Sequence, residues 1–119
     1  MLEYEVLDAC LKLLRDMFML KPGETIAITT DTMSSDEIVE ATAQAAVILG
    51  AKPLIFKIAA PEGAKAGDKD MPMKALIDGI KACDAWVEFN YKLIFYSTVY
   101  DKITEDPNNR PRYMNQNGV

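Results

Sequence analysis

The chain has 119 residues, of which 50% are hydrophobic and 26% are charged, and this composition excludes disorder along the whole length and predicts one folded domain. Eighteen acidic against 13 basic residues give a net charge of -5, with no cluster of Lys or Arg. Such a surface repels phosphate backbones, so nucleic acid is not an expected partner. The chain has no histidine, which excludes Ser-His-Asp catalysis, Cys-His catalysis and histidine-rich metal sites assembled from this chain alone.

The two cysteines and the N-terminal stretch indicate a reducing compartment. Cys10 and Cys83 both fall within apolar helical patterns and lack CxxC spacing, so we interpret them as buried thiols rather than as metal ligands or a disulfide. The N-terminal stretch carries acidic residues where a signal peptide carries positive charge. Because no apolar run approaches the roughly 20 residues of a membrane span, we expect a cytoplasmic protein with no membrane partner.

The first half of the chain predicts helix, strand, helix and strand in that order. Apolar residues recur at spacings of three and four over residues 3–20, which is typical of an amphipathic helix, and a Lys-Pro-Gly-Glu turn ends it. The β-branched run at 25–30 predicts a short central strand. Ser34 has capping-box spacing to the glutamate three positions later, which predicts a helix that ends at Gly50. Residues 54–59 predict a second strand with apolar side chains on both faces.

The second half repeats the same alternation of strands and helices. A loop rich in Pro, Gly, Lys and Asp spans residues 60–72 and precedes a helix that starts near Met73 and is weakened by Gly79. Residues 84–90 predict a third strand and residues 112–114 a fourth. A helix between them is predicted by four residues at helical spacing: Tyr96, Val99, Tyr100 and Ile103.

This order of elements predicts an α/β fold. We expect an open, mostly parallel sheet of about four strands with helices on both faces, a doubly wound and Rossmann-like arrangement. The whole of residues 1–119 forms a single domain in this interpretation.

Ligands bind open parallel sheets beyond the carboxyl ends of the strands, so three strand-to-helix loops are candidate sites. The loop at 31–35 has hydroxyl groups and a helix N-terminus, but acidic residues surround it and helix capping is its main interpretation. The loop at 60–72 lacks the glycine spacing of a phosphate site and is interpreted as solvated. The best candidate is the loop at 90–98, although structural packing is its main interpretation.

We assign six candidate ligand-binding residues: Asp31, Thr32, Asn90, Tyr91, Ser97 and Thr98. Just before the third loop, Trp86 and Phe89 are interspersed with Val87 and Glu88 on the strand, so one set can pack in the core. No catalytic or metal-binding residue can be assigned, because no nucleophile, base and oxyanion donor come together and no acidic group has EF-hand spacing.

The order of several short sequence elements resembles a known enzyme family. LKPGETIAITTDTMSSDEIVEATAQAAVILGAKPLIFKI is followed, after the Pro/Gly loop, by ALIDGIKACDAWVEFNYKLIFYSTVYDKI and RPRYMNQNGV. The KPGE turn, the TDT strand end, the LGA helix stop, the KACDAWVE strand entry and the RYM strand together resemble the N-terminal domain of aminopeptidase T-like metalloenzymes. That family includes leucyl aminopeptidases and the related 2,5-dihydroxypyridine 5,6-dioxygenases.

The resemblance implies that the chain is the N-terminal part of a longer enzyme, an α/β scaffold that helps to shape an active-site chamber and a dimer. It implies no catalytic residue and no cofactor in this chain, because a larger C-terminal domain supplies the Glu, His and Asp ligands of a divalent metal. The reaction implied for the full-length protein is hydrolysis at a peptide N-terminus or cleavage of an aromatic ring. The partners implied are that C-terminal domain or further copies of the chain, although Asn115 to Asn117 are more polar than the family pattern.

Two alternatives of other classes stay open on the residues alone. The chain fits a stand-alone module that binds a small molecule through the third loop or self-associates through an edge of its sheet. A small independent enzyme based on Asp or Cys chemistry is the weaker alternative.

Overall fold

The computed structural model describes residues 3–60, 71–90, 98–106, 108 and 111–115. Its elements follow the predicted order: α1 (Glu3–Lys12), the π-helical turn η1 (Leu13–Met17), β1 (Thr25–Asp31), α2 (Asp36–Ile48), β2 (Lys52–Ile58), α3 (Met73–Lys81), β3 (Ala85–Glu88), α4 (Thr98–Thr104) and β4 (Arg112–Asn115). The predicted loop at 60–72 lies mostly outside the described residues, as does Tyr96 of the predicted fourth helix.

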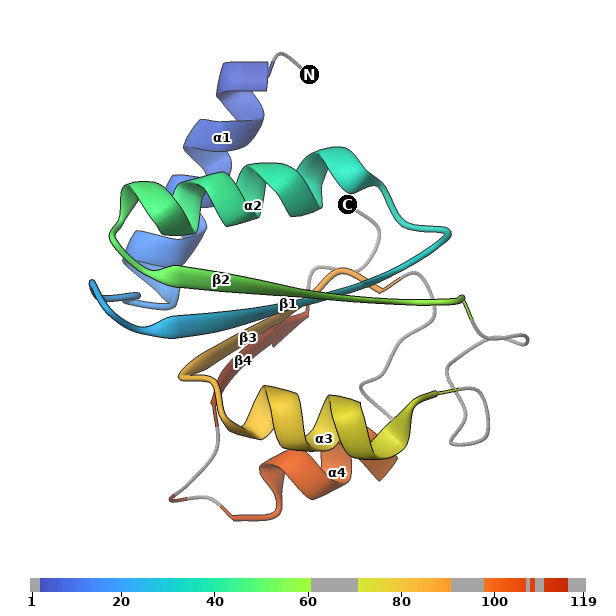
Figure 1. Ribbon diagram of the computed structural model, residues 1–119. Coiled ribbons are helices and arrows are strands. Elements are labelled where there is room, and N and C mark those ends of the chain that lie inside the picture. The colour runs from blue at the N-terminus through green and yellow to red at the C-terminus, as the bar shows by residue number, and fades with distance from the viewer. Residues whose placement is uncertain (1–2, 61–70, 91–97, 107, 109–110, 116–119) are drawn as a thin grey trace.

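The four strands form one parallel sheet in the order β2-β1-β3-β4. In Figure 1, α1 and α2 lie on one side of this sheet, and α3 and α4 lie on the other. We refer to these sides as the α1/α2 face and the α3/α4 face. The predicted doubly wound α/β fold is therefore confirmed.

Helices cover both faces of the central strands, so every residue of β1 after Thr25 and every residue of β3 is buried. On the α1/α2 face, Ile28 and Val87 pack with Leu14 of η1. On the α3/α4 face, Ala27 and Trp86 pack with helix residues that include Leu76, Ile80, Val99 and Ile103. Successive side chains on a strand point to opposite faces, which divides the core into these two layers.

The prediction that one set of strand residues near Trp86 packs in the core holds for both sets. Trp86 and Glu88 lie on the α3/α4 face and Val87 and Phe89 contribute to the α1/α2 face, and all four are buried. The physical reason is the position of β3 between β1 and β4, where helices cover both faces.

The first predicted helix is not one uniform helix over residues 3–20. It widens after Lys12 into η1, where the Phe18 N–H donates to the Leu13 carbonyl five residues back, at 3.1 Å. The chain then reverses through Met19, which has a left-handed φ of 52°. The predicted terminator of the second helix is confirmed, because Gly50 follows α2 with a φ of 83°.

Gly79 has a packing role that the sequence did not reveal. A Cβ at this position would lie 2.6 Å from Cε2 of Phe56 on β2, closer than any real contact. The glycine therefore lets α3 approach β2, and this contact offsets the weak helix propensity that the residue brings.

Candidate functional site

The carboxyl ends of β1 and β3 form the topological switch point of the sheet. The two strands are neighbours, but the helices that follow them lie on opposite faces of the sheet. α2 follows β1 on one face, and α4 follows β3 on the other. In open parallel sheets, ligands bind in the crevice that such diverging loops leave between them. Asp31, Thr32 and Asn90, three of the predicted site residues, lie at this place.

The Asp31 side chain organises the loop after β1. Its Oδ1 accepts from the Met33 N–H at 3.0 Å and lies 3.0 Å from Ser34 Oγ. Ser34 Oγ also lies 2.7 Å from the carbonyl oxygen of Phe89. A hydroxyl has one proton, so Ser34 donates to one of these two acceptors at a time. When it donates to the Phe89 carbonyl, the hydroxyl fastens this loop to the end of β3.

These contacts correct the predicted capping box. Ser34 was expected to cap the second helix, but the N-cap of α2 is Ser35, whose side chain makes no capping hydrogen bond. Ser34 is instead held by Asp31 and the Phe89 carbonyl, both at the switch point. The spacing between Ser34 and Glu37 predicted the start of α2 to within two residues, but it did not predict what the Ser34 hydroxyl binds.

Thr32 connects the loop after β1 to the end of β2. Its N–H donates to the Ile58 carbonyl at 3.1 Å, and its Oγ1 accepts from the Ala60 N–H at 3.0 Å. The residue therefore holds the two strand ends together, and in this arrangement its hydroxyl contributes to structure.

Asn90 and Thr30 carry polar atoms that are buried without a partner. Both residues are fully buried, and neither Nδ2 nor Oδ1 of Asn90 finds a hydrogen-bond partner in the part of the chain that the structure describes. The same holds for Thr30 Oγ1. The end of β3 therefore holds an unused donor and an unused acceptor. Leaving one such buried group unsatisfied costs about 1–3 kcal/mol.

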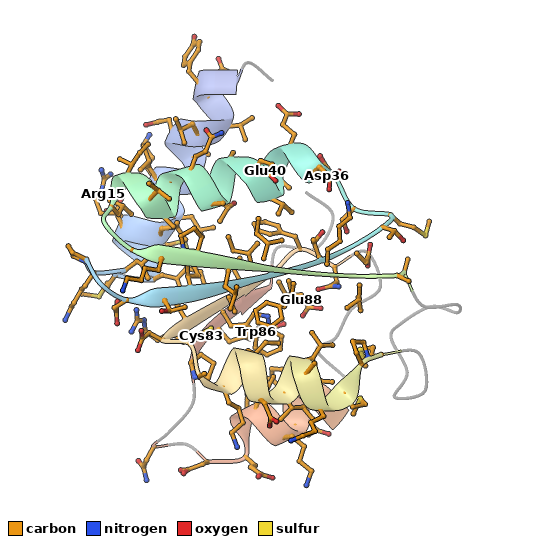
Figure 2. All side chains as sticks on the ribbon, in the orientation of Figure 1. Arg15, Asp36, Glu40, Cys83, Trp86 and Glu88 are labelled. Atoms are coloured by element: carbon orange, nitrogen blue, oxygen red, sulfur yellow. The ribbon has the colours of Figure 1, made fainter. Side chains whose placement is uncertain are left out.

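A buried carboxylate lies two residues before Asn90. Glu88 is fully buried on the α3/α4 face, where Figure 2 shows it beside Trp86 and on the side of α3. The Tyr113 hydroxyl donates to Glu88 Oε1 at 2.7 Å. Our sequence reasoning did not select Glu88, although an acidic residue within the apolar run AWVEF was a signal that could have found it.

A cluster of aromatic rings packs on the same α3/α4 face as this carboxylate. The rings of Trp86 and Tyr113 have centroids 4.5 Å apart, and Tyr100 lies 5.2 Å from Tyr113. The Trp86 Nε1–H donates to Thr29 Oγ1 at 2.9 Å, which joins β3 to β1. Neighbouring strands therefore hold these side chains in fixed positions.

The remaining predicted site residues are not placed by the structure. Tyr91 and Ser97 lie outside the described residues, and Thr98 is the first residue of α4, with a side chain that is not described. The site assignments at these three positions stay predictions.

A groove of about 470 Å³ runs beside the switch point on the α1/α2 face. Phe89 at the end of β3 and Ile38 of α2 line it together with Leu13 and Met17 of η1. Its volume falls in the range of small-molecule pockets, and its walls are mainly apolar.

The interpretation of both cysteines as buried thiols is confirmed. Cys10 and Cys83 are buried and unbridged. Burial raises the pKa of the Cys10 thiol, although its contact with Thr42 opposes this, and burial together with the charge of Asp84 raises the pKa of Cys83. Both thiols therefore stay protonated near neutral pH and are poor nucleophiles.

The described residues do not form a metal site. No group of three or more His, Cys, Asp or Glu side chains that could hold an ion occurs among them. Asp31 and Glu88 are instead engaged by hydrogen bonds from the protein itself. In the same described part of the chain, no helix is long and apolar enough to cross a membrane.

Comparison with known proteins shows a similarity of fold and no match of sequence. Neither a protein-family model nor a curated protein sequence matches the chain. The fold is similar to the structure of 2,5-dihydroxypyridine dioxygenase from Pseudomonas putida KT2440, with a TM-score of 0.71 and 17% sequence identity. The match covers 87% of this chain and 33% of that chain, so the protein spans about a third of its structural neighbour.

Proposed function

We propose that this chain serves as the N-terminal α/β domain of a metal-dependent enzyme of the aminopeptidase T-like kind. The observation that carries the proposal is the fold similarity to the dioxygenase, which extends over 87% of this chain and a third of that one. In such an enzyme, the complete protein hydrolyses peptides at their N-terminus or cleaves an aromatic ring. A domain contributed by the remaining two thirds of the enzyme would bind the divalent metal.

The described residues do not fit the metal, so the proposal gives this chain no step that the metal performs. Asp31 and Glu88 already accept hydrogen bonds from neighbouring groups, and no third ligand joins them within the described ranges. The role that these residues support is the shaping of one wall of a ligand chamber. The contact of Ser34 with Asp31 and the Phe89 carbonyl fixes that wall.

Asn90 is the residue that we assign to ligand contact. A carboxamide offers one donor and one acceptor side by side, which matches a ligand that presents an acceptor and a donor in return. Peptide groups and hydroxylated nitrogen heterocycles both have this property. The nearby acidic side chains Asp31, Asp36 and Glu37 disfavour phosphate at the same place.

The first test of this function is to read the coding DNA past codon 119. The proposal predicts that the frame continues into a larger domain with clustered Glu, His and Asp codons. The purified product should then contain a divalent metal and cleave an aminoacyl substrate or a dihydroxypyridine. A stop codon directly after Val119 would overturn the proposal for the native gene.

A further inference from the structure

β2 forms one edge of the sheet and exposes apolar side chains along it. The strand has seven residues, Lys52–Ile58, and β1 is its one neighbour among the described strands. Figure 1 shows it running along the border of the sheet between α2 and α3. Leu54 and Ile55 are 47% and 39% exposed, although they lie on opposite faces. The middle of the strand, from Leu54 to Phe56, is apolar, and an exposed apolar edge is a template for pairing with another strand.

The backbone groups available for such pairing follow from the register with β1. The Lys52 N–H donates to the Glu24 carbonyl at 2.8 Å, and the Thr32 N–H donates to the Ile58 carbonyl at 3.1 Å. These bonds, together with the parallel register, turn the even-numbered residues of β2 toward β1. The carbonyl groups of Pro53, Ile55 and Lys57 therefore point away from the sheet, as do the N–H groups of Ile55 and Lys57.

We propose that β2 pairs antiparallel with β2 of a second copy of this chain, on a two-fold axis at Ile55, to form a continuous eight-stranded sheet. Ile55 then exchanges both of its backbone hydrogen bonds with Ile55 of the partner subunit. The Lys57 N–H donates to the carbonyl of Pro53 of the partner subunit, and the reverse bond forms by symmetry. The missing N–H of Pro53 removes one bond from each of these outer pairs and leaves four bonds across the interface.

Two other two-fold registers on the same strand are less favourable. An axis at Pro53 places two prolines opposite each other, and neither has an N–H to donate. An axis at Lys57 places two like charges directly opposite, which is destabilising. The axis at Ile55 instead sets Lys57 against proline and Lys52 against isoleucine, so neither lysine faces its own copy.

The side chains are also self-complementary in this register. Leu54 lies opposite Phe56 of the partner subunit on the α3/α4 face, and Ile55 meets its own copy on the α1/α2 face. A two-fold interface requires one surface to complement itself, and these apolar pairs satisfy that requirement. This pairing follows from β2 and its register and is independent of the proposed enzymatic role.

Sedimentation equilibrium of the 119-residue chain tests the proposal. The wild type should sediment at twice the chain mass of 13.2 kDa. Ile55→Lys places a charge on the axis and should give a particle of 13.2 kDa. Lys57→Pro removes an outward N–H without touching the bonds to β1, and it should also give the monomer. Far-ultraviolet circular dichroism confirms that each variant is folded.

Two matched variants should keep the dimer. Lys57→Ala removes the same charged side chain as Lys57→Pro but retains the N–H. Ile48→Lys introduces the same change as Ile55→Lys at a residue that is 60% exposed on the last turn of α2, outside the paired strand. A wild-type chain that sediments as a monomer at every concentration, or a dimer that persists in either β2 variant, would overturn the proposed pairing.

Discussion

At the amino-terminal ends of the strands, polar groups from separate segments pair with one another, whereas the carboxyl ends bury polar groups that find no described partner. Arg112 of β4 donates to both carboxylate oxygens of Glu24, at 2.8 and 3.3 Å, and Glu24 also accepts from the Lys21 N–H. The Thr25 N–H donates to Asp84 at 2.9 Å. At the other end, the Asn90 carboxamide and the Thr30 hydroxyl are buried without such partners.

The amino-terminal end of the sheet therefore contributes to stability, whereas the carboxyl end retains polar groups for another purpose. Natural sequences satisfy nearly all buried polar atoms, and exceptions concentrate at functional sites. The exceptions here lie on β1 and directly after β3, next to the buried carboxylates of Asp31 and Glu88. These unpaired groups lie at the carboxyl ends of β1 and β3, which is where parallel sheets generally bind ligands.

The largest effect should follow Trp86→Ala. This variant tests whether the core next to the carboxyl end of the sheet is tightly packed. Trp86 is fully buried and joins β3 to Thr29. Removing the ring should lower the free energy of unfolding by about 3–5 kcal/mol in urea titrations. A loss below about 1 kcal/mol would mean that this region is loosely packed and would remove the significance of the unpaired Asn90.

A smaller effect should follow Gly50→Ala at the amino-terminal end. Gly50 has a left-handed φ of 83°, and an added Cβ would lie 3.2 Å from Cβ of Pro22. We expect a loss of about 2 kcal/mol from backbone strain and crowding together. Gly23→Ala is the matched control, because Gly23 has a similar φ of 85° but no atom within 4 Å of the added Cβ. Equal losses for the two variants would show that crowding against Pro22 contributes nothing.

The smallest effect concerns the ion pair between Glu24 and Arg112. The hydrogen bonds from Arg112 lower the pKa of Glu24 from its ordinary value of 4.5. A lowered folded-state pKa means that this pair stabilises the protein above pH 4.5 and that the contribution is lost as the pH falls through the lower folded value. Because Arg112 is 45% exposed, solvent limits the contribution to less than about 1 kcal/mol. Glu24→Gln should therefore reduce the loss of stability on acidification, as measured by urea titrations between pH 6 and pH 3.

Local patterns were sufficient to predict the order of the elements. The spacing of apolar residues in α1 and α2 and the glycine after α2 are local signals, because helix periodicity and left-handed caps depend on neighbouring residues. The carboxyl-end positions of Asp31 and Asn90 followed from the βα alternation alone.

Properties that depend on the third dimension were not predictable in the same way. The edge position of β2 is set by the strand order and not by its own residues. Ser34 was predicted to cap α2, but the end of β3, 55 positions away in the sequence, offers its hydroxyl a competing acceptor. The tight contact between Gly79 and Phe56 likewise requires the packing of α3 on the sheet.

The carboxyl end of the sheet retains polar groups that reduce stability, and urea unfolding of Asn90→Leu is the decisive test of this claim. Replacing an unpaired carboxamide with an apolar side chain of similar size should raise the free energy of unfolding by about 1 kcal/mol with an unchanged m value. Thr30→Val should act in the same direction, whereas Thr29→Val should destabilise, because Thr29 accepts a hydrogen bond from Trp86. A lower free energy of unfolding for Asn90→Leu would show that Asn90 has a structural partner and would contradict the claim.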